Sequence, residues 1–248
     1  MNGCVALVTG GSRRIGRALC EGLAAAGYRV AVHANGSLDE ASALAARLGS
    51  EAQAFRCDLR DRAAVADLVP RVRDALGPVG LLVNNASVFE HDGPADAGDD
   101  LWDAHFDVHL RAPVRLAQAL VDGLPDAADG HVVNMIDQRV WRLNPQFTSY
   151  TLSKSAMWTM TRTLAQRFAP RVRVNAIGPG PSLPSPRQAQ ESFDAQVDAV
   201  PLRRGPTLDE FSQALLFLER ARSVTGQMIA LDGGQHLAWE TPDFAVPE

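Results

Sequence analysis

The chain has 248 residues and a formal net charge of −5, and 46% of its residues are hydrophobic. This length is sufficient for one large core, and the lack of an uninterrupted apolar run of membrane-spanning length argues against an integral membrane protein. The acidic balance disfavours a nucleic-acid-binding surface, so we expect neither a membrane nor a nucleic acid among the partners.

Apolar runs and helical patterns alternate along the whole chain. We expect strands at 4–8, 28–33, 52–56, 79–83, 130–136, 171–176 and 227–231, and helices at 14–26, 38–48, 61–76, 99–123, 148–169 and 208–220. Strands that alternate with helices over mostly short connections predict right-handed crossovers and a parallel sheet covered on both faces. The expected fold is therefore α/β, a single doubly wound parallel sheet, with residues 1–248 as one domain that has no internal repeat or linker.

The first expected strand runs into a glycine-rich turn. Val5–Val8 is followed by the segment 9–16, which reads TGGSRRIG. Apolar residues then recur at helical spacing, so the turn joins a strand to the N-terminus of an amphipathic helix, where backbone N–H groups can hold a pyrophosphate. We interpret this segment as the first unit of a Rossmann fold, although its glycine spacing departs from G-x-G-x-x-G. A phosphate ligand also explains the basic cluster of Arg13, Arg14 and Arg17.

A second pattern lies in the expected helix 148–169. Tyr150 and Lys154 are four residues apart and therefore lie on one helical face, with Asp137 thirteen residues upstream of the tyrosine. We expect the lysine ammonium to lower the pKa of the phenol from about 10 toward working pH, which makes a proton donor for a reduction. The same spacing also occurs on solvated helices, so its meaning depends on its partners.

Five motifs in a fixed order carry a family resemblance. They are Thr9-Gly10-(x5)-Gly16, Asn84-Asn85-Ala86-Ser87, Tyr150-x-x-x-Lys154, Val174-Asn175-Ala176-Ile177-Gly178-Pro179-Gly180 and Asp232-Gly233-Gly234. In this order, over about residues 4 to 234, they resemble the short-chain dehydrogenases/reductases. Most members have serine where this chain has Asp137. The chain resembles pteridine reductase and the related bacterial dihydromonapterin reductase in the run 134–137, which ends in this aspartate, in Arg13-Arg14 and in the segments 85–89 and 178–182.

The end of the second expected strand bears on the nucleotide. Folds that prefer NAD usually place a carboxylate there, whereas this chain has Asn35 and Ser37 and no carboxylate over 32–37. These two side chains and the first-turn arginines can donate to a 2′-phosphate, which favours NADPH as the cofactor. Ser37 can also cap the helix 38–48, and the two roles can coexist. With the residues that the resemblance adds, the candidate cofactor-binding residues are Gly10, Ser12, Arg13, Arg14, Ile15, Gly16, Asn35, Ser37, Asp58, Leu59, Asn85, Ala86, Ser87, Tyr150, Lys154, Pro179, Gly180 and Ser182.

The aspartate changes the chemistry that the site suits. An ionised carboxylate beside a substrate carbonyl would repel the developing oxyanion, whereas reduction of a C=N bond requires a proton on nitrogen. We therefore expect hydride transfer from NADPH to a dihydropterin, with Tyr150 as proton donor, Asp137 beside it and Lys154 at the nicotinamide ribose. The candidate catalytic residues are thus Asp137, Tyr150 and Lys154, and the candidate substrate residues are Arg14, Ser87, Phe89, Asp137 and Tyr150. Phe89 offers a flat face to the pterin, or alternatively belongs to the core.

Two segments near the C-terminus have no regular pattern. The proline-rich run 179–186 and the weakly patterned stretch up to residue 200 follow an expected strand, at the sheet edge where ligands bind in such folds. We expect a substrate lid near 181–200. The tail 238–248 either packs on a neighbouring subunit or is disordered.

The paired histidines admit two interpretations. His105 and His109 are four residues apart, as in some metal sites, but no third ligand has a recognisable spacing, so we expect no metal. His109 also stands where the resemblance implies an asparagine that anchors a water, and its role is left open. The resemblance further implies a homotetramer built on the helices 99–123 and 148–169, with Trp158 and Phe168 as apolar contacts.

The remaining expectations concern location and other activities. No signal peptide is visible, and the three cysteines Cys4, Cys20 and Cys57 have no metal-binding spacing, which favours a cytoplasmic protein with reduced thiols. Two other functions stay open. One is a short-chain reductase of a small carbonyl or sugar, and the other is a catalytically silent NADP-binding sensor.

Overall fold

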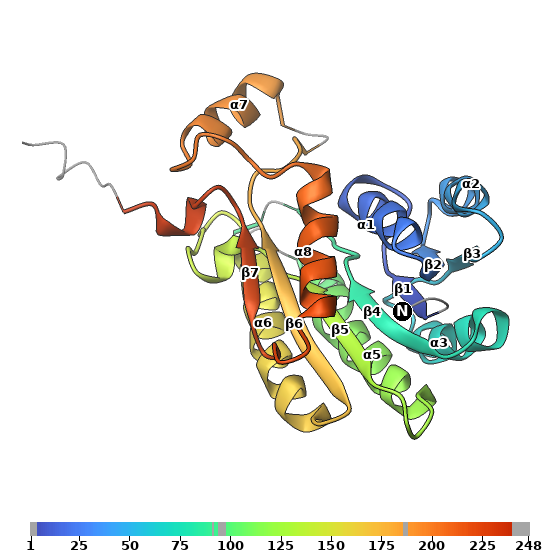
Figure 1. Ribbon diagram of the computed structural model, residues 1–248. Coiled ribbons are helices and arrows are strands. Elements are labelled where there is room, and N and C mark those ends of the chain that lie inside the picture. Colours follow the sequence, from blue (N-terminus) through green and yellow to red (C-terminus); the bar gives the residue numbers. More distant parts are fainter. Residues whose placement is uncertain (1–3, 91, 94–97, 186–187, 240–248) are drawn as a thin grey trace, which may run out of the picture.

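Seven parallel strands form one sheet in the order β3-β2-β1-β4-β5-β6-β7 (Figure 1). The structure is a computed structural model that describes residues 4–90, 92–93, 98–185 and 188–239. The strands are β1 (Val5–Val8), β2 (Arg29–Ala34), β3 (Ala52–Arg56), β4 (Val79–Asn84), β5 (Gly130–Met135), β6 (Val172–Pro179) and β7 (Met228–Leu231). This topology confirms the predicted doubly wound sheet, and the chain order reverses between β1 and β4, where ligands bind in such folds.

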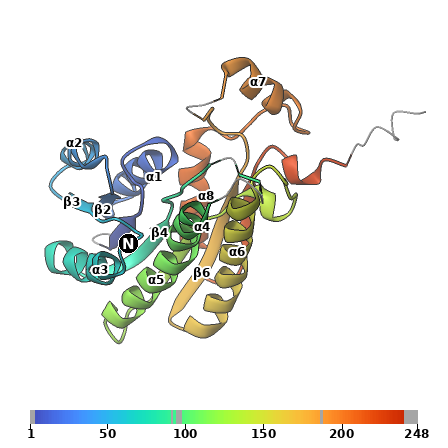
Figure 2. The same cartoon turned by 180° about the vertical axis from the view of Figure 1, so that it is seen from behind.

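Helices cover both faces of this sheet. One face carries α1 (Arg14–Ala25), α2 (Leu38–Leu48) and α8 (Leu208–Arg220), and the other carries α3 (Arg62–Leu76), α5 (Ala112–Gly123) and α6 (Thr148–Phe168) (Figures 1 and 2). Leu19, Leu23 and Phe211 are buried on the first face. Leu68 and Leu116 are buried on the second. Parallel strands are therefore buried on both sides, which explains their nearly continuous apolar runs.

The expected helix 99–123 is interrupted. It divides into α4 (Asp99–Phe106), a π-helical turn η1 (Asp107–Arg111) and α5, which has Pro113 in its first turn. A proline lacks the backbone N–H and its ring clashes with the carbonyl four residues earlier, so the regular hydrogen-bond ladder cannot continue through residue 109. The wider turn places His109 in the irregular segment.

The loops that follow the strands hold three short helices. These are η2 (Gln138–Val140) after β5, α7 (Gln190–Asp198) after β6 and η3 (Gln235–Leu237) after β7. Strand β6 runs three residues further than predicted, because Pro179 still pairs with Leu231 of β7. In both cartoons α7 lies beyond the carboxyl ends of the strands, separate from the two helical layers (Figures 1 and 2).

Phe168 corrects one expectation. Its side chain lies in the core of its own chain with Ala165 and Val172, and 9% of its surface is exposed. It is therefore not available as a subunit contact. Within the part of the chain that the structure describes, no helix has the length and apolar character needed to cross a bilayer.

Candidate functional site

Two connected hollows lie at the carboxyl ends of the central strands. The larger, of about 690 Å³, follows the glycine turn and the ends of β2 and β3, and the smaller, of about 260 Å³, lies over β5 and β6. Thirteen of the predicted cofactor residues line the larger one, namely Gly10, Ser12, Arg13, Arg14, Ile15, Gly16, Asn35, Ser37, Asp58, Leu59, Asn85, Ala86 and Ser87. The other five, Tyr150, Lys154, Pro179, Gly180 and Ser182, line the smaller one. Arg14, Ser87 and Phe89 line both, so the two hollows form one continuous site.

The glycine turn is closely packed against the strand beside it. A Cβ on Gly16 would lie 2.1 Å from the carbonyl oxygen of Gly10, whose own φ is +61°. The Asn85 amide donates to the carbonyls of Thr9 and Gly10, at 2.9 and 3.0 Å. These contacts leave no room for a side chain at Gly16, so a ligand can approach the backbone N–H groups at the start of α1.

His33 holds the same turn through a hydrogen bond from the Gly10 N–H. Sequence reasoning did not identify this residue. Its Nδ1 accepts from the N–H of Gly10 at 3.1 Å, and its Nε2 lies 3.0 Å from the Cys57 carbonyl. Burial lowers the pKa of His33 to about 4, so at pH 7 the ring is neutral and its Nε2–H donates to that carbonyl. The histidine thereby ties the turn to the ends of β2 and β3.

The hydroxyl of Ser37 faces the larger hollow. Ser37 is the N-cap residue of α2 but its side chain makes no capping bond, and its Oγ lies 2.7 Å from Oγ of Ser12. The interpretation of Ser37 as a cap is therefore wrong for the side chain. Both hydroxyls lie near the N-terminus of a helix, Ser12 near α1 and Ser37 at α2, where N–H groups and hydroxyls can donate to an anion.

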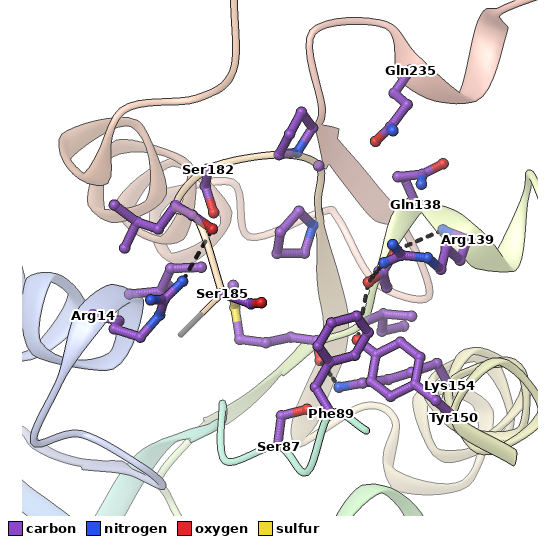
Figure 3. Close-up of a pocket in the computed structure, with 18 of the residues that line it drawn as sticks. Arg14, Ser87, Phe89, Gln138, Arg139, Tyr150, Lys154, Ser182, Ser185 and Gln235 are labelled. Carbon is purple, nitrogen blue, oxygen red and sulfur yellow. Dashed lines mark hydrogen bonds and ion pairs between the residues drawn. The ribbon is translucent and has the colours of Figure 1, made fainter. Parts of the chain in front are cut away.

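The two predicted phosphate-binding arginines have protein partners. Arg13 forms an ion pair with Glu40, and Arg14 donates to the carbonyls of Leu183 and Pro184 at 3.1 and 2.9 Å (Figure 3). Arg14 has φ 51°, in the left-handed region that residues other than glycine rarely adopt.

Arg60 and Asp58 form a second ion pair, with 2.9 Å between Nη2 and Oδ2, and both residues line the larger hollow. Sequence reasoning missed both Glu40 and Arg60, because each ion pair joins positions whose contact depends on how the loops fold.

The predicted catalytic residues meet in one buried corner. The Tyr150 hydroxyl donates to Oδ2 of Asp137 at 2.9 Å, and Nζ of Lys154 donates to the Met135 carbonyl at 2.8 Å (Figure 3). Tyr150, Lys154 and Asp137 expose only 5%, 1% and 9% of their surface. Helix α6 supplies the tyrosine and the lysine, and the aspartate lies two residues after β5, as the N-cap of η2. All three line the smaller hollow.

The electrostatics of this corner correct the expected role of the lysine. Burial raises the pKa of Tyr150 well above its ordinary value, and the charge of Asp137 raises it further. Burial also lowers the pKa of Lys154, to about 8. The expectation that Lys154 brings the phenol pKa down toward working pH is therefore wrong, because burial and Asp137 raise that pKa. The phenol is held as O–H, ready to donate.

Arg139 is the main site residue that sequence reasoning missed. Its Nη1 donates to Oδ2 of Asp137 at 2.9 Å, and its backbone N–H donates to Oδ1 at 2.8 Å. Its guanidinium lies 5.4 Å from the ring centre of Phe89 and 5.0 Å from that of Phe147. The signal was an aspartate before a short turn, since such a residue often accepts from the N–H two positions later.

Phe89 is half-buried and lines both hollows, so the alternative that it belongs to the core is wrong. Its ring stacks on Phe147 at 4.8 Å and meets the Tyr150 ring edge-on at the same distance. The residue therefore forms an aromatic wall beside the proton-donor corner.

His109 links the cofactor side of the site to helix α6. Its Nε2 accepts from the Val88 N–H at 3.2 Å and lies 2.9 Å from Oγ of Ser87. Its Nδ1 then carries the proton and donates to Oγ of Ser153 at 2.8 Å, which donates to the Tyr150 carbonyl at 2.7 Å. Burial keeps the pKa of His109 well below its ordinary value, so the ring is neutral. Both ring nitrogens are engaged, which leaves this histidine unsuited to hold a metal.

The expected lid borders the smaller hollow. Ser182, Gln188, Phe193 and Gln196 line it, while helix α7 has no buried residue among those described. Residues 186–187 of the expected lid 181–200, and 240–248 of the tail 238–248, lie outside the described residues. Phe193 and the rim glutamines were not identified from the sequence, because the helical pattern of this segment is weak.

Comparisons with known proteins place the fold and the site in context. The short chain dehydrogenase family profile matches residues 4–194. The crystal structure of FolM alternative dihydrofolate reductase 1 from Brucella canis complexed with NADP is similar, with 56% identity, a TM-score of 0.94 and coverage of 97% of this chain and 96% of that chain. The corresponding protein from Brucella suis, also in complex with NADP, has the same identity and TM-score and covers 97% and 98%. Protein FixR of Bradyrhizobium diazoefficiens is 36% identical over 94% of this chain and 87% of its own length.

Proposed function

The chain belongs to the short-chain dehydrogenase family, and we propose that it is an NADPH-dependent reductase of dihydropterins. The observation that carries this function is the carboxylate of Asp137, 2.9 Å from the Tyr150 hydroxyl, at a position where the family resemblance implies serine. The similar Brucella proteins are described as alternative dihydrofolate reductases complexed with NADP, and dihydrofolate contains a dihydropterin ring.

The larger hollow fits a nicotinamide nucleotide. We assign the pyrophosphate to the glycine turn, where the packing of Gly10 and Gly16 excludes side chains, and the 2′-phosphate to the Ser12 and Ser37 hydroxyls. Asp58 and Leu59 fit the adenine end, and Lys154 fits the nicotinamide ribose, near the smaller hollow. When bound, NADPH supplies a hydride.

Tyr150 and Asp137 deliver the proton that accompanies the hydride. The substrate's ring C=N bond takes a hydride at carbon and needs a proton at nitrogen, which the Tyr150 hydroxyl provides. Asp137 holds this hydroxyl in place through its 2.9 Å bond and keeps the phenol protonated until a better acceptor arrives. The pterin ring lies against Phe89, with Ser87 and Arg14 at its polar edges.

We assign the lid over this substrate to the described parts of the expected segment, 181–185 and 188–200, which border the smaller hollow. Arg14 already holds the carbonyls of Leu183 and Pro184, so the same side chain that meets the ligands also anchors the lid. We further assign the protein to the cytoplasm as a homotetramer, whose interface is formed by α4, α5 and α6 and includes Trp158. Cys4, Cys20 and Cys57 are free thiols, in agreement with a reducing compartment.

Steady-state assays of NADPH oxidation test the function. The panel contains dihydromonapterin, dihydrobiopterin, dihydrofolate, a small ketone and a ketose, each with wild type and Tyr150→Phe. We expect turnover with at least one dihydropterin and loss of at least about 10²-fold in kcat for the variant. Turnover of the ketone or ketose alone would establish a carbonyl reductase instead. NADPH binding without turnover of any of the five would favour an NADP-binding sensor.

A further inference from the structure

Arg139 has a role in proton delivery that the family resemblance does not assign. We propose that Arg139 is a positioning residue that clamps the Asp137 carboxylate against the Tyr150 hydroxyl and balances the negative charge left when the tyrosine gives up its proton. The clamp is a property of the corner itself, whereas its effect on turnover rests on the proposed dihydropterin reduction.

Arg139 provides two of the three hydrogen bonds that the carboxylate receives from described residues. Oδ1 accepts from the Arg139 N–H at 2.8 Å, and Oδ2 accepts from the Arg139 Nη1 and from the Tyr150 hydroxyl, each at 2.9 Å. The two side chains are mostly buried, with 17% of the arginine and 12% of the aspartate side chain exposed. A buried carboxylate needs such partners to remain ionised and in one orientation.

Counting the charges shows why the reaction needs this cation. With the proton on Tyr150, the corner holds two cations, Arg139 and Lys154, and one anion, Asp137. When the proton moves to the ring nitrogen and a hydride moves to the ring carbon, the C=N bond becomes C–N, the substrate is reduced, and the nicotinamide is oxidised. The corner then holds two anions against two cations, until solvent returns a proton to the phenolate. The oxidised nicotinamide also gains a positive charge. Without the arginine, however, Lys154 would be the one side-chain cation among the described residues of the corner to balance a buried phenolate and carboxylate, which is costly where water is scarce.

The aromatic wall keeps the guanidinium in this place. It lies 5.4 and 5.0 Å from the ring centres of Phe89 and Phe147, which stack on each other at 4.8 Å. A cation over an aromatic ring gains about 0.5–1 kcal/mol at a partly exposed site. A planar guanidinium can keep this contact and still donate to Oδ2, which a lysine ammonium does less well.

Steady-state kinetics test the clamp. Arg139→Met should lower kcat for the dihydropterin by about 10- to 100-fold and leave KM and NADPH affinity within about twofold, because the loss falls on the proton step. Arg139→Lys should recover part of kcat. The control is Arg73→Met, which removes the guanidinium of an ion pair with Asp74 at the end of α3, outside both hollows, and it should leave kcat unchanged.

A double-mutant cycle shows whether Arg139 acts through the aspartate. In the Asp137→Asn background, Arg139→Met should lower kcat by less than about threefold, because the group it clamps is already neutral. An equal loss in both backgrounds would overturn the proposal, as would a raised KM with unchanged kcat, which would make Arg139 a substrate contact.

A third readout does not depend on turnover. The chain has two tyrosines, Tyr28 and Tyr150, so a fluorotyrosine-labelled protein gives two fluorine NMR signals that Tyr28→Phe assigns. Asp137 raises the pKa of Tyr150 and Arg139 lowers it. The Tyr150 signal should therefore titrate at higher pH in Arg139→Met and at lower pH in Asp137→Asn.

The two failures can be told apart in this experiment. Unchanged titration in Arg139→Met would overturn the clamp even in an active enzyme. If the wild type reduces no dihydropterin but the two variants shift the titration in opposite directions, the proposed function fails and the clamp stands.

Discussion

Lys154 is the only lysine in the sequence, and the fold buries it with 1% of its surface exposed. A buried ammonium lowers the free energy of unfolding, so we expect Lys154 to destabilise the fold while it serves the activity. We predict that Lys154→Met makes the folded protein more stable at pH 7 while it removes most of the activity. Methionine has a similar length and no charge, and therefore tests the charge rather than the volume.

The magnitude follows from the shifted pKa. Burial lowers the pKa of Lys154 from 10.5 to about 8. At about 1.4 kcal/mol for each unit, keeping the ammonium charged in the folded state costs about 3 kcal/mol. The bond from Nζ to the Met135 carbonyl is lost in the variant, and such a charged bond contributes about 1.5–3 kcal/mol. Since that bond only partly offsets the cost of charging, we expect a net gain of about 1 kcal/mol.

The stability difference between Lys154→Met and the wild type should depend on pH. Below pH 8 the amine is charged in both states, so the full cost is present. Between pH 8 and 10.5 the folded protein releases the proton while the unfolded chain keeps it. The unfolded state then binds more protons, and the stability of the wild type rises with pH. The variant lacks this rise, so its advantage should shrink as pH increases through this window.

Urea unfolding at pH 7 and pH 9.5, at one protein concentration, measures both effects. Because Lys154 is the only lysine, lysine-selective ¹⁵N labelling also gives a single side-chain signal whose midpoint reports its pKa directly. We expect that midpoint near 8. A variant that is less stable than the wild type at pH 7, or a stability difference that does not change with pH, would refute the reasoning.

Three further predictions concern single positions. Asp137→Ser should lower dihydropterin turnover by at least about 10²-fold in single-turnover kinetics, with NADPH affinity nearly unchanged, since the residue acts on the proton. NADPH should bind at least about tenfold tighter than NADH in fluorescence titrations, a difference of about 1.4 kcal/mol that one phosphate contact provides. Gly16→Ala should abolish nucleotide binding by calorimetry, because its Cβ would lie 2.1 Å from the Gly10 carbonyl oxygen; retained tight binding would exclude the turn as the pyrophosphate site.

Most of the fold was predictable because its signals are local and repeated. Buried parallel strands read as apolar runs, and the predicted strand 52–56 and helices 38–48 and 208–220 match the observed bounds. The helix 99–123 was not predicted correctly, since a proline inside a long helical pattern, here Pro113, gives either a kink or a new start. Its outcome depends on how His109 packs against Ser153, which is a tertiary contact.

The site was predictable wherever a motif fixes a spacing. Tyr150 and Lys154 lie on one face of α6, and the glycine turn lies at the start of α1, as their spacing requires. The direction of the tyrosine's pKa was not predictable in the same way. It depends on burial and on which charge lies closest, and the structure places Asp137 in hydrogen-bond contact with the hydroxyl while Nζ of Lys154 bonds the Met135 carbonyl.

An aspartate in place of serine also needs partners that the motif of Tyr150 and Lys154 does not include. A serine hydroxyl is neutral and can lie beside a tyrosine without further support, whereas a buried carboxylate requires donors and a nearby cation. Residue 139 can meet both needs, because its N–H reaches Oδ1 through the η2 turn and its side chain returns to Oδ2. Arg139 therefore supplies both the donors and the cation that the buried Asp137 carboxylate requires. A chain of this family with aspartate at this position and no cation within reach should deliver the proton less well.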